Sequence, residues 1–284
     1  MRRDIDKIDL VTFKDVPQQL YKYRDWSNDY HKKILTEREI YFTNVRAFND
    51  PLDNAIALRW DLLTPDQYAD IQAFAYKGLN PEVSDQELSN FRTDTFNEFS
   101  EMTPEDKLEL IKRHKTKTQD SVGVLSLSFV PDSTSMWAYY ANNHYGFCLG
   151  FDAKRVQEFD SFNFGLFDVD YENILPKIIP STNNFQNWTK SLCTKSVHWQ
   201  HEEEARFLHK YGSNKVINFP GDMYHAILFG CRMSNKDKKE IIMATKDYDL
   251  FPNVYYLEIF TDPFSFELDA NPVTQKRIDE ILQS

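Results

Sequence analysis

The sequence predicts an α+β fold with a mixed, mostly antiparallel sheet and a helical insert. Short apolar runs typical of strands lie before residue 60 and after residue 118, and three helix-start signals lie between them. Strands and helices alternate irregularly, unlike the regular βαβ series of a parallel sheet. We expect one domain over residues 1–284, with residues 60–118 as a helical insert or lid within it.

The elements before the insert are short. Residues 18–24 and 39–43 contain aromatic and β-branched residues and are predicted strands. Ser27 is a suitable N-cap for a short helix that ends at Leu35. Residues 48–53 predict a turn, because Asn and Asp side chains bond nearby backbone groups and Pro fixes φ.

The insert contains three N-terminal capping signals. Thr64, Ser84 and Thr103 can each cap a helix; Pro follows the first and the third, and Glu87 lies three residues after Ser84. Apolar residues at mixed spacings of three and four follow each signal, so we expect the insert to be helical.

Strands dominate the rest of the chain. Apolar runs at residues 122–129 and 145–151 are predicted strands, and residues 135–141 between them suit one or two helical turns. Further strands are expected at residues 167–171, 205–209, 227–231, 255–260 and 264–268, and helices at residues 234–244 and 273–282.

Composition limits the classes of function. Lys and Arg number 33 against 44 Asp and Glu, so the formal net charge is −11 and the pI is about 5.1. Such an acidic chain is unsuited to an extended nucleic-acid interface. Neither G-x-G-x-x-G nor G-x-x-x-x-G-K-[ST] occurs. Three scattered Cys without a C-x-x-C pair, and no membrane-length apolar run, predict a cytoplasmic protein that binds no membrane.

Basic side chains on the first predicted strand form one candidate site. On a strand, Lys22 and Arg24 share one face, and Tyr21 and Tyr23 share the other. One interpretation is an edge strand with a solvated basic face. The other places a basic side chain against a ligand phosphate or carboxylate, which the planar guanidinium of Arg binds bidentately.

A polar and aromatic group follows in the middle of the chain. Ser126 and Ser128 share one face of their strand, and Trp137, Tyr140 and His144 come shortly after. The aromatic side chains either belong to the core or line a pocket that stacks a flat heteroaromatic ring. No G-x-S-x-G motif surrounds either Ser, so a hydrolase nucleophile is not expected.

Carboxylates cluster late in the chain. In a helix, Glu202 and Arg206 would be an i,i+4 pair on a solvated face. In a loop that enters a strand, Glu202, Glu204 and Arg206 would point to one side, and crowded carboxylates are typical of a catalytic or ligand-binding edge. A metal site of His198, His201 and a Glu lacks the H-E-x-x-H spacing, and no metal is expected.

The loop at residues 48–53 has two interpretations as well. Asn49 and Asp50 either only shape a turn, or bond a ribose and orient a neighbouring Arg. A metal-dependent nuclease or hydrolase, disfavoured by the scattered spacing, would use Asp50, Asp53, Glu202, Glu204 and His144.

Taken in order, these segments resemble a bacterial family known as domain of unknown function 2971. The family label carries no assigned chemistry. The resemblance rests on residues 20–24, 40–43, 48–53, 125–128, 136–141, 144–151 and 170–171, and on the spacing of Trp199, Glu202, Glu204 and Arg206.

The same order of motifs is similar to that of ADP-ribosyltransferases of the Arg–Ser–Glu type. In that superfamily a basic residue on the first strand holds the NAD phosphates, a Ser-x-Ser strand supports the nicotinamide ribose, and a later Glu-x-Glu segment supplies the catalytic carboxylate. The resemblance implies an ADP-ribosyltransferase-like fold and catalysis by Glu204 with Glu202. The residues expected to bind NAD are Arg24, Lys22, Tyr23, Asn49, Asp50, Ser126, Ser128, Trp137, Tyr140, His144 and Arg206.

We therefore expect an NAD-dependent ADP-ribosyltransferase-like enzyme, a toxin or phage-defence effector that cleaves NAD and modifies a macromolecule. NAD would be a substrate, and the expected partners are a protein acceptor or an antitoxin-like regulator. The alternative is a non-catalytic module on a degenerate fold that senses a nucleotide or binds a protein.

Overall fold

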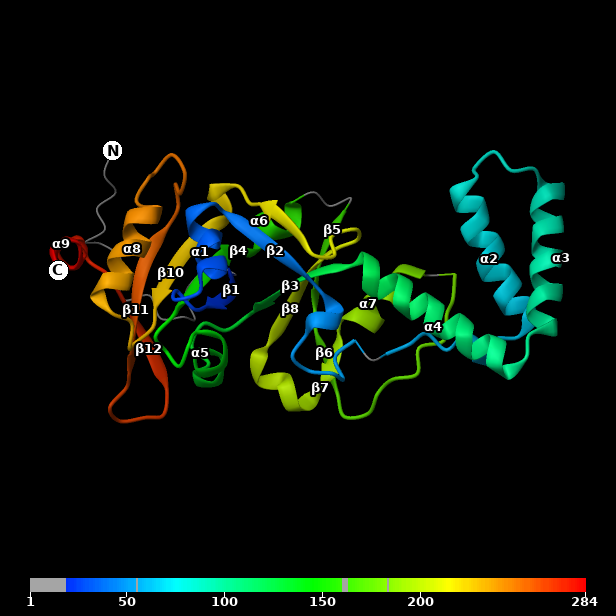
Figure 1. Cartoon of the computed structure of the whole chain (residues 1–284), viewed down its shortest axis with the longest axis horizontal. Helices are drawn as coiled ribbons and strands as arrows, with labels where there is room; N and C mark the ends of the chain where they lie inside the picture. The colour runs from blue at the N-terminus through cyan, green and yellow to red at the C-terminus, as the bar shows by residue number, and fades with distance from the viewer. Residues whose placement is uncertain (1–18, 55, 160–162, 183) are drawn as a thin grey trace. The chain divides into compact units, whose positions relative to one another are not determined.

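A computed structural model describes residues 19–54, 56–159, 163–182 and 184–284. The chain divides into two compact units. Unit 1 comprises residues 1–43, 123–168 and 198–284, and unit 2 comprises residues 44–122 and 169–197. Figure 1 shows the elements of both units along the chain.

Unit 1 is built on a ten-stranded sheet. One part of it has the order β12-β11-β10-β4-β1, and these neighbours are antiparallel except β10 and β11, which are parallel. The strands of this part are β1 (Gln19–Arg24), β4 (Phe147–Asp152), β10 (Tyr224–Phe229), β11 (Tyr255–Thr261) and β12 (Leu268–Pro272).

The other part of the sheet is organised around β3. Strand β3 pairs with β8 along its length, β8 pairs with β5, and the path continues from β3 to β2 and β9. These strands are β2 (Glu39–Asn44), β3 (Gly123–Ser128), β5 (Phe164–Asp168), β8 (Glu204–His209) and β9 (Lys215–Asn218).

The two parts meet between β1 and β3. Strand β1 pairs with β4 over all six of its residues, but it pairs with β3 at one position, where Tyr21 lies opposite Ser128. Beyond that position β3 continues toward β2 instead. We call the divergence between residues 22–24 of β1 and residues 125–127 of β3 the fork.

Helices cover both faces of the unit 1 sheet. Leu20, Leu127 and Phe147 pack in one core cluster, which also receives apolar residues of α1, α6, α8 and α9. Tyr21 and Tyr23, on the other face of β1, pack against α5. The helices of this unit are α1 (Asp29–Thr36), α5 (Thr134–Tyr140), α6 (Ala153–Glu158), α8 (Asn235–Thr245) and α9 (Gln275–Gln283).

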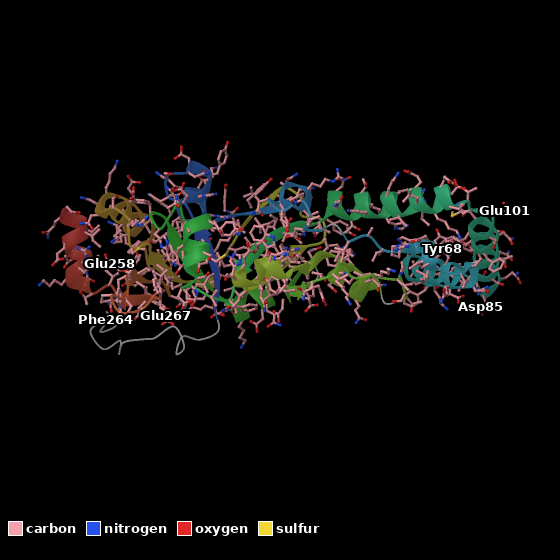
Figure 2. The ribbon with its side chains drawn as sticks, turned by 90° about the horizontal axis from the view of Figure 1, so that it is seen from below. Tyr68, Asp85, Glu101, Glu258, Phe264 and Glu267 are labelled. Atoms are coloured by element: carbon pink, nitrogen blue, oxygen red, sulfur yellow. The ribbon has the colours of Figure 1, made fainter. Side chains whose placement is uncertain are left out.

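Unit 2 is mostly helical. Helices α2 and α3 lie side by side (Figure 1), and the rings of Tyr76 and Phe91 stack between them with centroids 4.2 Å apart. Tyr68 of α2 stacks on Phe99 of α3 within a core that includes Trp60. Figure 2 marks Tyr68 and the first and last residues of α3. The elements are α2 (Pro65–Leu79), α3 (Asp85–Glu101), α4 (Pro104–Ser121), α7 (Asn184–Leu192), and the paired strands β6 (Asp170–Glu172) and β7 (Thr194–Ser196).

The structure confirms a mixed α+β fold with a mostly antiparallel open sheet. It also confirms the three capping signals, because Thr64, Ser84 and Thr103 are the N-caps of α2, α3 and α4. The predicted insert lies within unit 2. That the chain forms one domain stays a prediction. In the described part of the chain, no helix has the length and hydropathy needed to cross a membrane.

Several boundaries differ from the prediction. The expected strand at residues 264–268 is largely a turn, because Asp262 and Ser265 accept hydrogen bonds from the backbone N–H groups of Phe264 and Glu267; β12 begins only at residue 268. The expected strand at residues 167–171 falls on two strands, β5 and β6, which pair with different partners.

Other differences are smaller. Asn28, not Ser27, caps α1, since its side chain accepts from two N–H groups of the first turn. The predicted strand residue Gln18 lies outside the described residues. Among the α-helices and strands of the described residues, α6, α7, β7 and β9 have no counterpart in the prediction.

Removing the cap of α4 is expected to destabilise unit 2. Thr103 accepts from the Asp106 N–H, and Asp106 accepts from the Thr103 N–H, which forms a reciprocal capping box. Thr103→Ala should lower the free energy of unfolding by about 1 kcal/mol, measured by urea unfolding followed by circular dichroism. Thr93→Ala, in the exposed middle of α3, is the control and should cause no loss; equal losses would contradict the capping role.

Candidate functional site

The turn before β8 buries two carboxylates at once. Glu202 ends a 3-10 helix (Val197–Glu202), and Glu204 begins β8; both are 4% exposed. Between them Glu203 is exposed and has a left-handed backbone with φ 41°. Both of its neighbours are buried, while the side chain of Glu203 itself faces solvent. The alternative of one helix over Glu202 and Arg206 is wrong, since Arg206 lies within β8.

Glu202 is held through its side chain and its backbone. The Tyr140 hydroxyl donates to Oε1 of Glu202 at 2.7 Å. The Ser128 hydroxyl donates to the Glu202 carbonyl at 2.6 Å, and the Phe129 N–H donates to the Glu203 carbonyl at 2.8 Å. Residues from α5 and from the end of β3 therefore fix the position of this turn.

Glu204 forms a buried ion pair with Arg206, two residues along β8. Arg206 Nε lies 3.0 Å from Oε1, and Nη2 lies 3.2 Å from Oε2, so the contact is bidentate. Arg206 is completely buried. The guanidinium predicted to bind the cofactor is thus directed to Glu204, to which it donates two hydrogen bonds.

The fork holds two half-buried cations. Lys22 Nζ donates to the Ser126 carbonyl, and Arg24 Nη1 donates to the Tyr23 carbonyl at 3.4 Å. Neither forms an ion pair with a carboxylate in the part of the chain that the structure describes. Burial, with the positive charge of Arg24 adding to it, holds the pKa of Lys22 well below its usual value, while Glu204 and Glu202 oppose the shift. Burial lowers the pKa of Arg24 to about 10.

This arrangement favours an anion at the fork. Two cations lacking carboxylate partners among the described residues are costly to bury, and a bound phosphate would supply the missing charge and acceptors. The buried carboxylates Glu202 and Glu204 are close enough to shift the pKa of Lys22. Of the two cations, only Lys22 is affected by these charges, and strand register places Glu204 on the face of Tyr21, with Lys22 and Arg24 on the opposite face of β1.

His31 of α1 borders the cations without adding a charge. Its Nδ1 accepts from the Asp25 N–H at 3.3 Å. Burial and the neighbouring Arg24 lower the pKa of His31 to about 4. The imidazole is therefore neutral at pH 7 and adds no positive charge beside Lys22 and Arg24.

The predicted aromatic residues have different environments. Trp137 is fully buried, donates from Nε1 to the Pro131 carbonyl at 2.8 Å and packs edge-on against Tyr23. The buried Tyr23 donates to the Val130 carbonyl at 2.7 Å. Both rings therefore serve the core, whereas Tyr140 is half-buried beside Glu202.

His144 lies near this group of rings. Its plane is within 12° of the Trp137 plane at a centroid distance of 6.3 Å, and its backbone is left-handed with φ 71°. Burial and the nearby Arg232 lower its pKa.

The Asn49–Asp50 loop belongs to unit 2. Asp50 Oδ1 accepts from the Leu52 N–H at 2.8 Å, which confirms the turn chemistry predicted there. Asp53 is buried and lies 3.7 Å from the buried Lys195. Among the described residues, no group of three or more His, Cys, Asp and Glu side chains is arranged to hold a metal ion.

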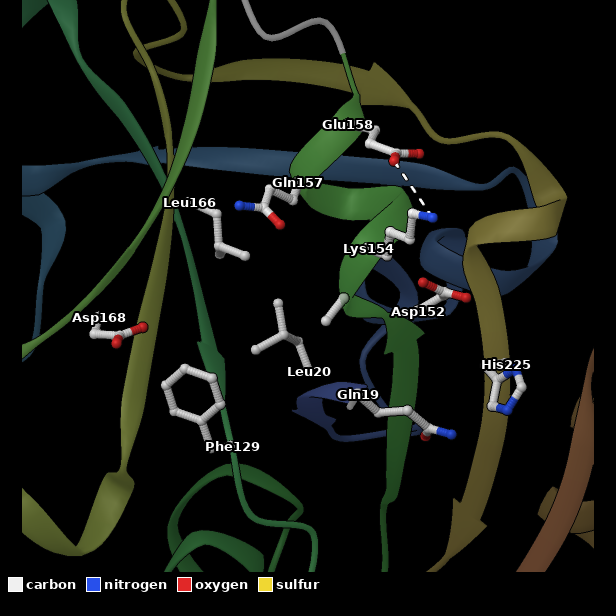
Figure 3. Close-up of a pocket in the computed structure, with 11 residues that line it drawn as sticks. Gln19, Leu20, Phe129, Asp152, Lys154, Gln157, Glu158, Leu166, Asp168 and His225 are labelled. Carbon is white, nitrogen blue, oxygen red and sulfur yellow. Dashed lines mark ion pairs between the residues drawn. The ribbon is translucent and has the colours of Figure 1, made fainter. Parts of the chain in front are cut away.

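Sequence reasoning missed an open pocket of about 740 Å³ in unit 1. Figure 3 shows the apolar side chains of Leu20, Phe129 and Leu166 between Asp168 and the polar side chains of α6. The wall also includes Gln19, whose Nε2 donates to the Tyr255 hydroxyl at 3.2 Å. The lining comes from five distant segments, and no local motif marks such a pocket.

The profile of a protein family described as Protein of unknown function (DUF2971) matches residues 136–207. The matched segment resembles that family. It includes β4, the Glu202–Glu204 turn and the first residues of β8, and so supports the resemblance inferred from the sequence motifs. No curated protein and no solved structure matches the chain.

The left-handed turn gives a direct test of the local geometry. Glu203→Val is expected to lower the free energy of unfolding by about 1–2 kcal/mol, because a β-branched side chain is strained at positive φ. Glu203→Gly should stay close to the wild type, since relief of strain offsets the added freedom of the unfolded chain. Both are measured by urea unfolding. Equal losses for the two variants would contradict the assigned conformation.

The neutral His31 predicts a pH dependence. Its folded-state pKa of about 4 lies below the unfolded value of about 6.5. The unfolded chain therefore binds more protons between these values, and stability falls as the pH drops from 6.5 to 4. His31→Asn should flatten this part of the curve of urea midpoint against pH. His198→Gln, at an exposed position, is the control; an unchanged slope in His31→Asn would refute the assignment.

Proposed function

We propose that this protein is an NAD-cleaving, ADP-ribosyltransferase-like enzyme with an ADP-ribosyltransferase-like fold in unit 1. The observation that supports the proposal is the fork, where the half-buried Lys22, with Arg24 beside it, is near enough to the buried Glu202 and Glu204 for their charges to act on it. NAD needs both groups, because its pyrophosphate is anionic and its ribose becomes cationic as nicotinamide leaves.

The proposed binding mode pairs the anionic groups of NAD with the basic side chains of β1. Arg24 and Lys22 bind the pyrophosphate, the guanidinium through two parallel hydrogen bonds. Ser126, at the same place on β3, is half-buried and offers a hydroxyl to a ribose. Tyr140 presents a half-buried ring edge beside Glu202, where the nicotinamide would lie.

The proposed reaction uses the carboxylates in two roles. The bond between ribose C1′ and the nicotinamide nitrogen breaks, and neutral nicotinamide leaves with the electron pair. The positive charge left on the ribose is stabilised by the Glu204 carboxylate, which Arg206 holds in place through two hydrogen bonds. Water or an acceptor nucleophile then bonds to C1′ and loses its proton to Glu202, which Tyr140 orients.

A reaction that consumes NAD and modifies a macromolecule suits a toxin or a phage-defence effector, and we include that role in the proposal. The acceptor is then a protein, and an antitoxin-like protein is the expected regulator. Hydrolysis of NAD without an acceptor follows the same steps, except that water is the nucleophile that bonds to ribose C1′.

A second candidate function is a non-catalytic module that senses a nucleotide or binds a protein. The observation that favours it is that both carboxylates are 4% exposed and already bond to Tyr140 and Arg206. In that case the cations of the fork still bind a nucleotide, but the carboxylates only support the fold.

Nicotinamide release from NAD distinguishes the two functions. Wild type, Glu204→Gln and Glu202→Gln are compared with and without cell lysate as a source of acceptor. Loss of transition-state charge stabilisation should slow Glu204→Gln by about 100-fold or more. Loss of a general base should slow Glu202→Gln by about 100-fold.

Glu203→Gln is the matched control, because it removes the same charge from the exposed neighbour and should retain activity. Arg24→Gln should weaken NAD binding, measured by calorimetry. Full turnover by Glu204→Gln would refute the proposed catalytic role. Wild type that binds NAD through Arg24 but releases no nicotinamide would favour the non-catalytic module.

A further inference from the structure

A row of aromatic rings leads from Glu202 to the surface of unit 1. Tyr140 lies beside Tyr139 with ring centroids 6.4 Å apart, Tyr139 lies 6.2 Å from His201, and His201 lies 6.1 Å from Trp199. Tyr139 is 67% exposed, and His201 is also exposed. Tyr139 and His201 are the two rings of this row that solvent reaches most.

Two further aromatic side chains project from the connection between β11 and β12. Phe264 is 96% exposed, and Phe266 is fully exposed. The connection has a defined shape, because Asp262 and Ser265 accept backbone hydrogen bonds within it and the Asp262 N–H donates to the Glu267 carbonyl at 3.2 Å. Figure 2 shows Phe264 and Glu267 together at this end of the unit.

Contacts link the connection to the ring row. Ser133 Oγ, at the start of α5, lies 3.5 Å from the His201 carbonyl. Leu268 and Ala270 of β12 pack in one core cluster with Met136 and Trp137 of α5. The charges of Glu267 and Asp269 add to burial in raising the pKa of the adjacent Asp132. The rings and the β11–β12 connection therefore border one surface, which we call the aromatic–acidic face.

The carboxylates of this face lack cationic partners. Asp132, Glu203, Glu267 and Asp269 form no ion pair in the part of the chain that the structure describes, whereas many other surface carboxylates do. Exposed rings next to unpaired carboxylates attract cations that can also stack. They repel the phosphates of a nucleic acid or of an anionic membrane.

We propose that the aromatic–acidic face of unit 1 docks an arginine-rich segment of another protein. Guanidinium groups stack on Tyr and Trp faces and form bidentate bonds with carboxylates, whereas ammonium groups do so less well. The net charge of −11 steers such a segment toward the protein. The proposal is independent of NAD chemistry.

Labelled oligoarginine and oligolysine peptides of equal length test this docking. Each is titrated with the full chain, without NAD, at about 0.15 M salt, and binding is followed by fluorescence anisotropy. Oligoarginine is expected to bind more tightly than oligolysine. Tyr139→Ser combined with His201→Ser removes two exposed rings and should weaken oligoarginine binding by about fivefold or more.

Tyr248→Ser is the matched control, because Tyr248 is 72% exposed on α8's side of the unit and should not affect binding. Phe264→Ser combined with Phe266→Ser is a second variant that leaves the core intact, and it should also weaken binding. Absence of oligoarginine binding, equal affinity for both peptides, or binding that the ring variants leave unchanged would each overturn the proposal. Nicotinamide release plays no part in this assay, so either proposal can fail without the other.

Discussion

The candidate site depends on one constraint, the single pairing position between β1 and β3. If the two strands paired along their full lengths, backbone hydrogen bonds would close the gap now occupied by the Lys22 ammonium. Because they pair only where Tyr21 meets Ser128, the carbonyl of Ser126 accepts from Lys22 instead of from a strand neighbour. A divergence inside a sheet leaves polar backbone groups and space that side chains or a ligand must satisfy. Lys22 lies in this divergence, near enough to Glu202 and Glu204 for their charges to act on it.

The burial of Glu202 and Glu204 in turn goes with the backbone conformation of Glu203 between them. Glu203 accepts a left-handed conformation, which is unfavourable for most L-residues, and its two neighbours become buried. Such strain is found where the surrounding structure over-determines it and often at functional sites. Here the Ser128 hydroxyl and the Phe129 N–H hold the turn from β3, so the same strand forms one side of the fork and anchors the carboxylates.

The architecture could be predicted where local chemistry decides it. Thr103 with Pro104 marks the start of α4 because capping is a short-range interaction, and the apolar alternation around Leu125 marks β3 for the same reason. Local reasoning failed at residues 264–268, where two Phe predict a strand. Side chains of Asp262 and Ser265 accept backbone hydrogen bonds there and form a turn, and both Phe rings are exposed.

The candidate site could be predicted in part. Lys22, Arg24, Ser128, Glu202 and Glu204 all lie in unit 1, but strand periodicity places Lys22 and Arg24 on the face of β1 opposite to Ser128 and Glu204. Their partners could not be derived, since pairing of distant strands is decided by the whole sheet.

Trp137 illustrates the limit of residue type as a signal. A Trp near Tyr and His suggests a stacking site, but here its ring fills the core between α5 and β1. Arg206 is similar, since its position on β8 was foreseen while its bidentate pairing with Glu204 within the interior was not. The solvent exposure of a side chain depends on tertiary packing, so a sequence pattern does not predict it.

The central claim is that the fork is a nucleotide site. A crystal structure of the protein with ADP-ribose tests it most directly, because this ligand lacks the bond that the proposed reaction breaks. We predict the pyrophosphate within hydrogen-bond distance of Arg24 and Lys22, and the terminal ribose beside Glu202 and Glu204. A fork closed by protein contacts, with ADP-ribose bound in the pocket beside α6 or absent at saturating concentration, would contradict the claim.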